Sequence, residues 1–196
     1  MRQEDRPARR RAVIIMDSRA LGHQGSGTLA SFEWAVTAAA SIATHFSSHS
    51  FALHLVTSET TVGGAATRTI EIDNALASLA VAQLGTDQEL EEVLRCAQAV
   101  TSVGGLVVAI VTDRDEDVMR RVGALLHPGG TGLLFLLDST SFGPGRPGPP
   151  GDPTLALATM FRPSGWNTCI VSSGITVAQA WTTVSAHADH PAGVGR

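Results

Sequence analysis

The sequence predicts an α/β fold: a three-layer, Rossmann-like sandwich with a mainly parallel sheet and helices on both faces. Short β-branched runs recur along the chain and are apolar at nearly every position, as in strands covered on both faces. Segments with helical spacing of apolar residues separate these runs, and such alternation is typical of parallel sheets. The length of 196 residues suits one domain with one core.

The element order follows from these patterns. Parallel strands are expected at residues 12–16, 51–57, 106–112, 133–137 and 168–172. A short antiparallel edge strand is expected at 67–72, where polar and apolar residues alternate. Helices are expected from Ser31, over 74–84, from Thr86, over 118–126, over 155–161 and over 177–186. Thr86 and Glu89 have the spacing of a capping box, which places a helix start there.

We expect a single domain over residues 12–187 with short segments at both ends. Residues 1–11 form a basic N-terminal segment, and residues 188–196 a flexible tail. Residues 139–153 are rich in proline and glycine and are expected to be a mobile loop without regular structure. The basic segment carries Arg6, Arg9, Arg10 and Arg11. It is either a solvated stretch or a contact with anionic lipid.

Composition excludes several classes of function. The net charge of −4 argues against general nucleic-acid binding, and no apolar stretch approaches the roughly 18–20 residues that cross a bilayer. The two cysteines, Cys96 and Cys169, lie apart in apolar surroundings and are expected to be inert core residues. We interpret the seven histidines as scattered, with His54 structural, and expect no histidine-based zinc site.

Three carboxylates follow predicted strands: Asp17, Asp113 and Asp138. Ligands of open α/β sheets gather outside the carboxyl ends of the strands, near the point where the strand order reverses. Two carboxylates at neighbouring strand ends could hold Mg²⁺, which prefers oxygen ligands and keeps several waters. Mg²⁺ is therefore the metal that such a pair of strand ends would favour.

Two strand-end motifs resemble those of von Willebrand factor A domains. These are Val-Ile-Ile-Met-Asp17 and Val-Ala-Ile-Val-Thr-Asp113. More narrowly, Asp17-Ser-Arg-Ala and the helix that begins Ser31-Phe-Glu-Trp-Ala-Val-Thr resemble actinobacterial members of the domain of unknown function 58 family. The resemblance covers nearly the whole chain and implies a von Willebrand factor A-like domain.

The resemblance also implies a degenerate metal-ion-dependent adhesion site. Metal-binding A domains carry Asp-x-Ser-x-Ser after the first strand, and here Arg19 and Leu21 stand at the two serine positions. Arg19 offers no acceptor oxygen and is expected to repel a divalent ion and to bridge Asp17 or Asp113 instead. We therefore expect no tightly bound metal and propose Asp17, Ser18, Arg19 and Asp113 as a binding surface.

Two further positions bear on this metal-site pattern. The threonine that such sites usually take from a middle loop has no counterpart that we can assign. Asp138, Thr140 and Phe142 partly repeat the first-loop pattern, with phenylalanine at the fifth position, and we interpret this as coincidence.

The resemblance further implies a cytoplasmic module that binds a protein. The family is usually anchored by N-terminal membrane helices and is often encoded beside MoxR-type ATPases of the AAA+ class. This chain shows no such helices, so it is interpreted as a candidate fragment of a longer protein tethered to the inner face of the membrane. The expected function is a non-catalytic scaffold with an AAA+ ATPase as partner.

A glycine-rich loop supports an alternative. Gly25, Gly27 and Ala30 match Gly-x-Gly-x-x-Ala, and the amides around Gly25, Gly27 and Thr28 could bind the phosphate of a nucleotide or dinucleotide in an enzyme. Seven residues, 18–24, separate Asp17 from Gly25, which is long for a dinucleotide fingerprint. The same residues also suit a flexible loop that leads into a helix. The sequence nominates no catalytic residue, because Gly-x-Ser-x-Gly is absent.

Overall fold

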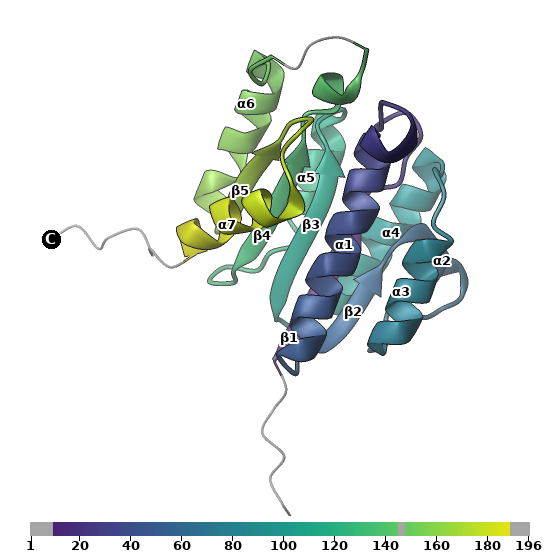
Figure 1. Cartoon of the computed structure of the whole chain (residues 1–196). Helices are drawn as coiled ribbons and strands as arrows, with labels where there is room; N and C mark the ends of the chain where they lie inside the picture. Colours follow the sequence, from purple (N-terminus) through teal and green to yellow (C-terminus); the bar gives the residue numbers. More distant parts are fainter. Residues whose placement is uncertain (1–9, 145–147, 189–196) are drawn as a thin grey trace, which may run out of the picture.

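The computed structural model describes residues 10–144 and 148–188, and its sheet is five-stranded and parallel throughout (Figure 1). The strand order is β2-β1-β3-β4-β5. The strands are β1 (Arg11–Met16), β2 (Ala52–Val56), β3 (Leu106–Thr112), β4 (Gly132–Leu137) and β5 (Trp166–Val171). The predicted α/β class with a parallel sheet is confirmed.

Helices cover both faces of the sheet (Figure 1). They are α1 (Ser31–Ser48), α2 (Ser58–Val62), α3 (Ile72–Ala80), α4 (Asp87–Thr101), α5 (Glu116–Gly123), α6 (Asp152–Met160) and α7 (Val177–Ala188). The core on one face involves α1, α3 and α7, and the core on the other involves α4, α5 and α6. Short 3-10 turns are η1 (Gly27–Leu29), η2 (Ser139–Phe142) and η3 (Arg162–Ser164).

The inner strand β1 shows why the sheet is covered on both sides. Val13 and Ile15 belong to one core, whereas Ile14 and Met16 belong to the other, and all are fully buried. Successive side chains of a strand point to opposite faces, so an unbroken apolar run needs helices on both. Burial of each large aliphatic side chain contributes about 1.5–3 kcal/mol to the stability of the fold.

The predicted antiparallel edge strand at 67–72 is wrong. The amide of Ile70 donates to the carbonyl of Leu53 in β2 at 2.9 Å, but the segment forms no strand of the sheet. The residues from Ile72 onward form α3 instead, because Ala75 and Leu79 continue from Ile72 at helical spacing and are buried against the core. Among the described residues the sheet therefore has no antiparallel strand.

The segment 139–153 is more ordered than predicted. Ser139–Phe142 forms η2, with Ser139 and Phe142 buried, and α6 already begins at Asp152. Residues 145–147 lie outside the described part of the chain, as do residues 1–9 of the basic segment and residues 189–196 of the tail. Within the described residues, no helix is both long and apolar enough to cross a membrane.

The strand order fixes where a site can form. The chain passes from β1 to β2 on one side and then returns to β3 on the other, so the order reverses between β1 and β3. The carboxyl ends of these two strands are neighbours, since Met16 pairs with Ile110 and the Asp17 amide donates to the Ile110 carbonyl at 2.9 Å. This edge is where ligands of such sheets usually bind.

Candidate functional site

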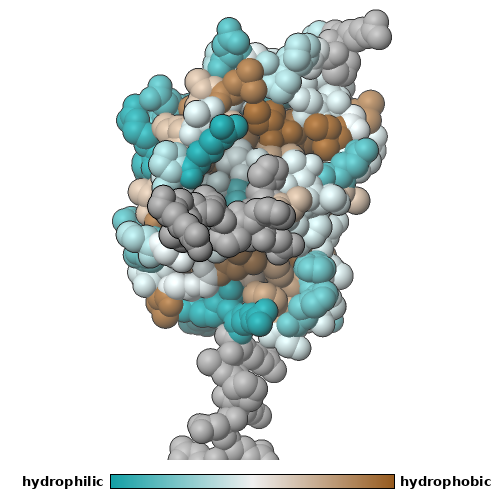
Figure 2. Space-filling model, turned by 90° about the vertical axis from the view of Figure 1, so that its left-hand side faces the viewer, coloured by the Kyte–Doolittle hydropathy of each residue, from teal (hydrophilic) through white to brown (hydrophobic). Residues whose placement is uncertain are grey.

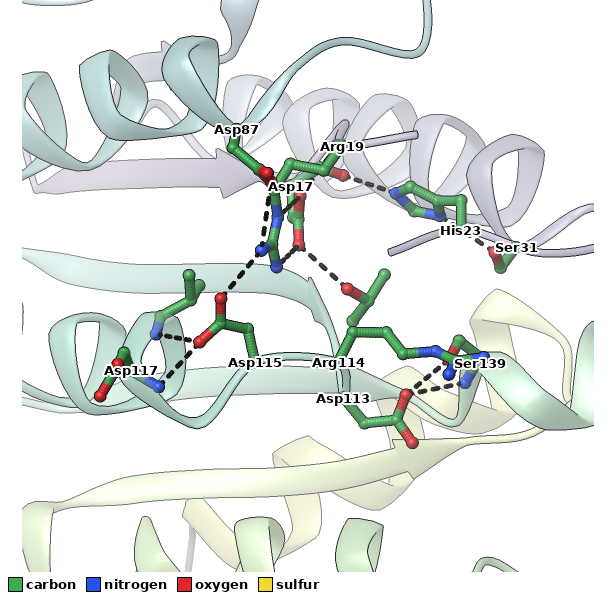
Figure 3. Close-up of polar contacts among 12 residues, drawn as sticks. Asp17, Arg19, His23, Ser31, Asp87, Asp113, Arg114, Asp115, Asp117 and Ser139 are labelled. Carbon is green, nitrogen blue, oxygen red and sulfur yellow. Dashed lines mark hydrogen bonds and ion pairs between the residues drawn. The ribbon is translucent and has the colours of Figure 1, made fainter. Parts of the chain in front are cut away.

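A buried ion pair occupies the end of β1 (Figure 3). The Nε and Nη2 atoms of Arg19 donate to Oδ1 and Oδ2 of Asp17 at 3.1 and 2.9 Å. The Arg19 amide also donates to Oδ1 at 3.0 Å, and the Thr112 hydroxyl donates to Oδ2 at 3.1 Å. Asp17 is fully buried and Arg19 is 5% exposed. The prediction that Arg19 bridges one of the two aspartates is confirmed for Asp17.

Two more carboxylates face the guanidinium. Nη1 of Arg19 lies 3.5 Å from Asp115 and 3.7 Å from Asp87. Burial acts to lower the pKa of Arg19, but its hydrogen bond to Asp17 and the three carboxylate charges outweigh burial and raise that pKa. One arginine therefore faces three carboxylates, which leaves a local excess of negative charge.

Two helix starts bring these acids to the site. Asp115 is the N-cap of α5, and its Oδ1 accepts from the amides of Asp117 and Val118 at 2.9 and 3.2 Å (Figure 3). Asp87 is the first residue of α4, and the loop before it is tied to the end of β1. The Gly85 amide donates to the Ser18 carbonyl at 2.7 Å. The approach of these two acids to Arg19 was not predicted from the sequence.

Thr86, in the same loop, is one candidate for the middle-loop threonine that could not be assigned from the sequence. Its hydroxyl is used inside α4, where it donates to Glu89 Oε2 at 3.0 Å and accepts from the Glu89 amide at 3.3 Å. The predicted capping box is thus confirmed. The signal for this position was the Gly-Thr-Asp run at 85–87, which we interpreted only as a helix start.

Asp113, at the end of β3, is not paired with Arg19. Its Oδ1 accepts from the Ser139 amide at 3.1 Å and from the Ser139 hydroxyl at 2.7 Å, and its Oδ2 accepts from the Thr154 hydroxyl at 2.6 Å. Arg114 Nε donates to the same Ser139 hydroxyl at 2.8 Å. Asp113 therefore joins β3 to η2 and α6, and the structure does not bring it together with Asp17.

These contacts do not fit a divalent ion between Asp17 and Asp113. A carboxylate offers about four acceptor positions, and the donors from Arg19 and Thr112 fill those of Asp17. Among the described residues, no group of three or more histidine, cysteine, aspartate or glutamate side chains is placed to hold a metal. An ion would first have to displace the Arg19 guanidinium.

The partial repeat of the motif after β4 forms local bonds. The Thr140 hydroxyl donates to Asp138 Oδ1 at 2.7 Å, and the Ser172 hydroxyl donates to Oδ2 at 3.5 Å. Phe142, at the fifth position, packs into the core and is 8% exposed. Both donors thus come from residues that close the β4 and β5 ends of the sheet.

His23 links the end of β1 to the start of α1. Its Nε2 donates to the Asp17 carbonyl at 2.8 Å, and its Nδ1 lies 3.0 Å from the Ser31 hydroxyl (Figure 3). Burial lowers the pKa of His23 more than its bond to the Asp17 carbonyl and the Asp17 charge raise it, and the Arg19 charge lowers it further. The neutral imidazole is therefore the favoured form in the fold.

This shift predicts a pH dependence of stability. Because the pKa of His23 is below 6.5 in the folded chain, the unfolded chain binds more protons just below pH 6.5. The contribution of His23 is fully present above that pH and is lost as the pH falls. We expect the free energy of unfolding, measured by urea titration from about pH 7.5 to about pH 5, to fall less steeply in His23→Gln. An unchanged slope would contradict this role.

The glycine loop binds its own chain. The Ser31 amide donates to the Gln24 carbonyl at 2.9 Å, and the Gln24 amide donates to the Ser31 hydroxyl at 2.9 Å. Gly25 and Gly27 have positive φ values of 89° and 60°, which suit glycine, and Thr28 lies in η1 on the surface. The amides of Gln24 and Ser31, on either side of the loop, are thus engaged within the chain, and phosphate binding by the amides around Gly25, Gly27 and Thr28 stays a prediction.

Exposed leucines lie beside the ion pair. The Ala20 amide donates to the Gly85 carbonyl at 2.9 Å. Leu21 follows Ala20 and Leu84 precedes Gly85, so the two leucines flank this backbone hydrogen bond. Leu21 is 80% exposed and Leu84 is 51% exposed. Ser18 is buried, and its hydroxyl lies 3.1 Å from that of Ser58. Of the four residues predicted as a binding surface, Asp17, Ser18 and Arg19 are buried and Asp113 is half-buried, because they bond to one another and to the neighbouring loops. The groups open to solvent at this end of the sheet are instead the two leucines and the acids Asp87 and Asp115.

The predictions for the cysteines are confirmed, whereas one of those for the histidines is wrong. Cys96 and Cys169 are buried and free, and burial raises the pKa of both thiols, so both are protonated core residues as predicted. His54 is buried, with Arg11 Nη2 at 3.1 Å from its Nε2. The interpretation of the histidines as scattered was wrong for His45 and His49, whose ring centroids lie 4.3 Å apart at the end of α1.

Comparison with protein-family models, with curated proteins and with solved structures gives no match. The class of the protein therefore rests on its own topology. A parallel sheet of order 2-1-3-4-5 flanked by helices is a Rossmann-like arrangement, which is also similar to that of von Willebrand factor A domains. The membership in a particular family stays a prediction.

Proposed function

We propose that this chain is a non-catalytic protein-interaction module, a von Willebrand factor A-like domain with a degenerate metal site. The observation that carries the proposal is the Arg19–Asp17 pair, in which the arginine occupies the acceptor oxygens that a metal would need. Charge, in addition to the missing serine hydroxyls, opposes a divalent ion there. The resemblance to the domain of unknown function 58 family supports the same interpretation.

The surface next to this pair suits a protein partner. We call the residues Leu21, Leu84, Asp87 and Asp115 the strand-end surface. It combines two exposed leucines with two carboxylates that are 65% and 43% exposed. Interfaces of this kind place apolar anchors beside a polar rim, and the local excess of negative charge favours a basic rim on the partner.

A MoxR-type AAA+ ATPase is the partner that the resemblance implies, and the same resemblance implies a cytoplasmic module. This identity is carried by analogy, because a fold hosts many functions. The nucleotide-binding alternative rests on the Gly-x-Gly-x-x-Ala match at 25–30, whereas the protein-interaction function is supported by the Arg19–Asp17 pair and by the exposed leucines beside it.

Binding to a purified MoxR-type ATPase from the same genome tests the proposal. We expect Leu21→Asp to weaken binding by about tenfold or more, because loss of a buried apolar anchor typically exceeds about 1 kcal/mol. The matched control is Val103→Asp, which changes a 70% exposed residue at the amino end of β3, away from this surface. Equal binding by the wild type and Leu21→Asp, or an equal loss in Val103→Asp, would contradict the proposal.

A further inference from the structure

We infer that the outer edge of β5 is a second binding site, which takes an extended peptide segment of a partner as an added strand, with a carboxylate of that peptide at Arg162. The site is independent of the strand-end surface. Three features support it: the unpaired edge of β5, the groove beside this edge and the charge at one end of that groove.

The backbone of β5 has a defined outer side. The Gly165 carbonyl accepts from the Gly132 amide at 3.3 Å, and the Val171 carbonyl accepts from the Asp138 amide at 2.9 Å. Backbone groups of a strand alternate in direction, so residues 165, 167, 169 and 171 face β4. The N–H and C=O groups of Thr168 and Ile170 therefore face away from the sheet.

These outward groups are unpaired within the sheet. β5 is the terminal strand and pairs with β4 alone. In the described residues, the one hydrogen bond that reaches them is a weak bond from the Cys169 thiol to the Ile170 carbonyl at 3.6 Å. Such an edge is a template for an added strand, whose backbone supplies the complementary donors and acceptors.

A groove of about 530 Å³ lies along this edge. Thr168 and Ile170 form its floor, Ala158 of α6 lines one wall and Gln179 of α7 lines the other. Figure 2 looks onto this side of the molecule and shows separate groups of apolar residues in brown. A recess between two helices admits an extended chain more readily than a second globular edge.

The Thr168 hydroxyl adds a polar anchor in the floor of the groove. Its Oγ1 atom is buried and has no hydrogen-bond partner among the described residues. A buried hydroxyl without a partner is unfavourable, so a polar group that reached it from the added strand would gain a hydrogen bond at little further desolvation.

Charge identifies the occupant. Arg162 is the one charged residue lining the groove; it is exposed, lies in η3 just before β5 and forms no ion pair with any described residue. Arginine binds carboxylates through two parallel hydrogen bonds. The groove itself supplies no acid, so a second copy of this edge would leave Arg162 unpaired, whereas an acidic peptide would pair with it.

A phage-displayed library of random heptapeptides, selected on the immobilised full chain, tests the inference. We expect the selected peptides to carry aspartate, glutamate or a free C-terminal carboxylate beside alternating apolar residues. Titration of a synthetic consensus peptide should show about tenfold or greater loss in Arg162→Glu and in Ile170→Pro. Proline at 170 removes an outward N–H and no bond to β4, so circular dichroism should show an intact fold.

The opposite edge of the sheet supplies the control. Arg68→Glu changes an exposed arginine beyond β2 and should bind the peptide as the wild type does. Peptide binding should also slow amide hydrogen exchange at Thr168 and Ile170. Selection of no peptide, retention of binding in Ile170→Pro, or equal loss in Arg68→Glu would overturn the inference. Protection of the same amides by dimerisation without peptide would also overturn it.

Discussion

Replacement of Arg19 by alanine is expected to lower the free energy of unfolding by about 3–5 kcal/mol, because it leaves a buried carboxylate without its counter-charge. Asp17 is fully buried and would keep only the donors from Thr112 and from the backbone amide of residue 19. The energetic penalty arises from the desolvated charge left behind more than from the lost attraction.

Urea unfolding of matched variants measures this effect. Arg120→Ala is the control, since Arg120 also pairs with two carboxylates, Glu116 and Asp117, but its side chain is 60% exposed. Exposed pairs contribute about 0–1 kcal/mol, so this variant should be close to the wild type. If Arg19→Ala also lost less than about 1 kcal/mol, the pair would not be the central contact of this site.

Asp17→Asn in the Arg19→Ala background separates charge from packing. The amide removes the uncompensated charge, and we expect the double variant to be more stable than Arg19→Ala alone. Residues in direct contact usually show coupling energies of about 0.5–3 kcal/mol in such cycles. If the losses of stability in Arg19→Ala and in Asp17→Asn alone added up to the loss in the double variant, the two side chains would act independently.

The sequence predicted the strands well where the residue pattern fits only one kind of element. β1, β3 and β4 are apolar on both faces, and only a covered parallel strand satisfies such a run. The predicted edge strand at 67–72 was wrong because the positions of Ile70 and Ile72 fit both the two-residue period of a strand and the 3.6-residue period of a helix. Ile72 alternates with Ile70 as a strand would, but it also lies three and seven residues before Ala75 and Leu79, and a helix brings all three against the same core.

The site was predictable only where its partners are close in sequence. Arg19 is two residues from Asp17, so the charge alone suggested their pair. Asp87 and Asp115 reach Arg19 from two helix starts whose positions depend on the whole fold. Asp113 was assigned to the same site because its strand neighbours β1, yet hydroxyls from η2 and α6 hold it elsewhere. Strand order places a residue at an edge but does not fix which way its side chain turns.

Because Asp113 joins β3 to η2 and α6, we expect a second large loss of stability in Asp113→Ala. The change removes the acceptor for the Ser139 amide, the Ser139 hydroxyl and the Thr154 hydroxyl. Ser139 is fully buried and Thr154 is 3% exposed, so water cannot replace the carboxylate without rearrangement. Each buried donor left unpaired costs about 1–3 kcal/mol. We expect a total loss of about 2–4 kcal/mol, with part recovered as the hydroxyls rotate to other acceptors.

The loss of stability should be largest in α6, because the Thr154 hydroxyl ties the first turn of this helix to Asp113 at the end of β3. Amide hydrogen exchange in Asp113→Ala should accelerate in α6 and η2 more than in α1, on the opposite face of the sheet. Asp113→Asn keeps an acceptor oxygen for Ser139 and should lie between the alanine variant and the wild type. Asp152→Ala, which changes an exposed acid in the same turn, should have little effect. Equal losses in Asp113→Ala and Asp152→Ala would mean that the bond from Thr154 to Asp113 does not hold α6 on β3.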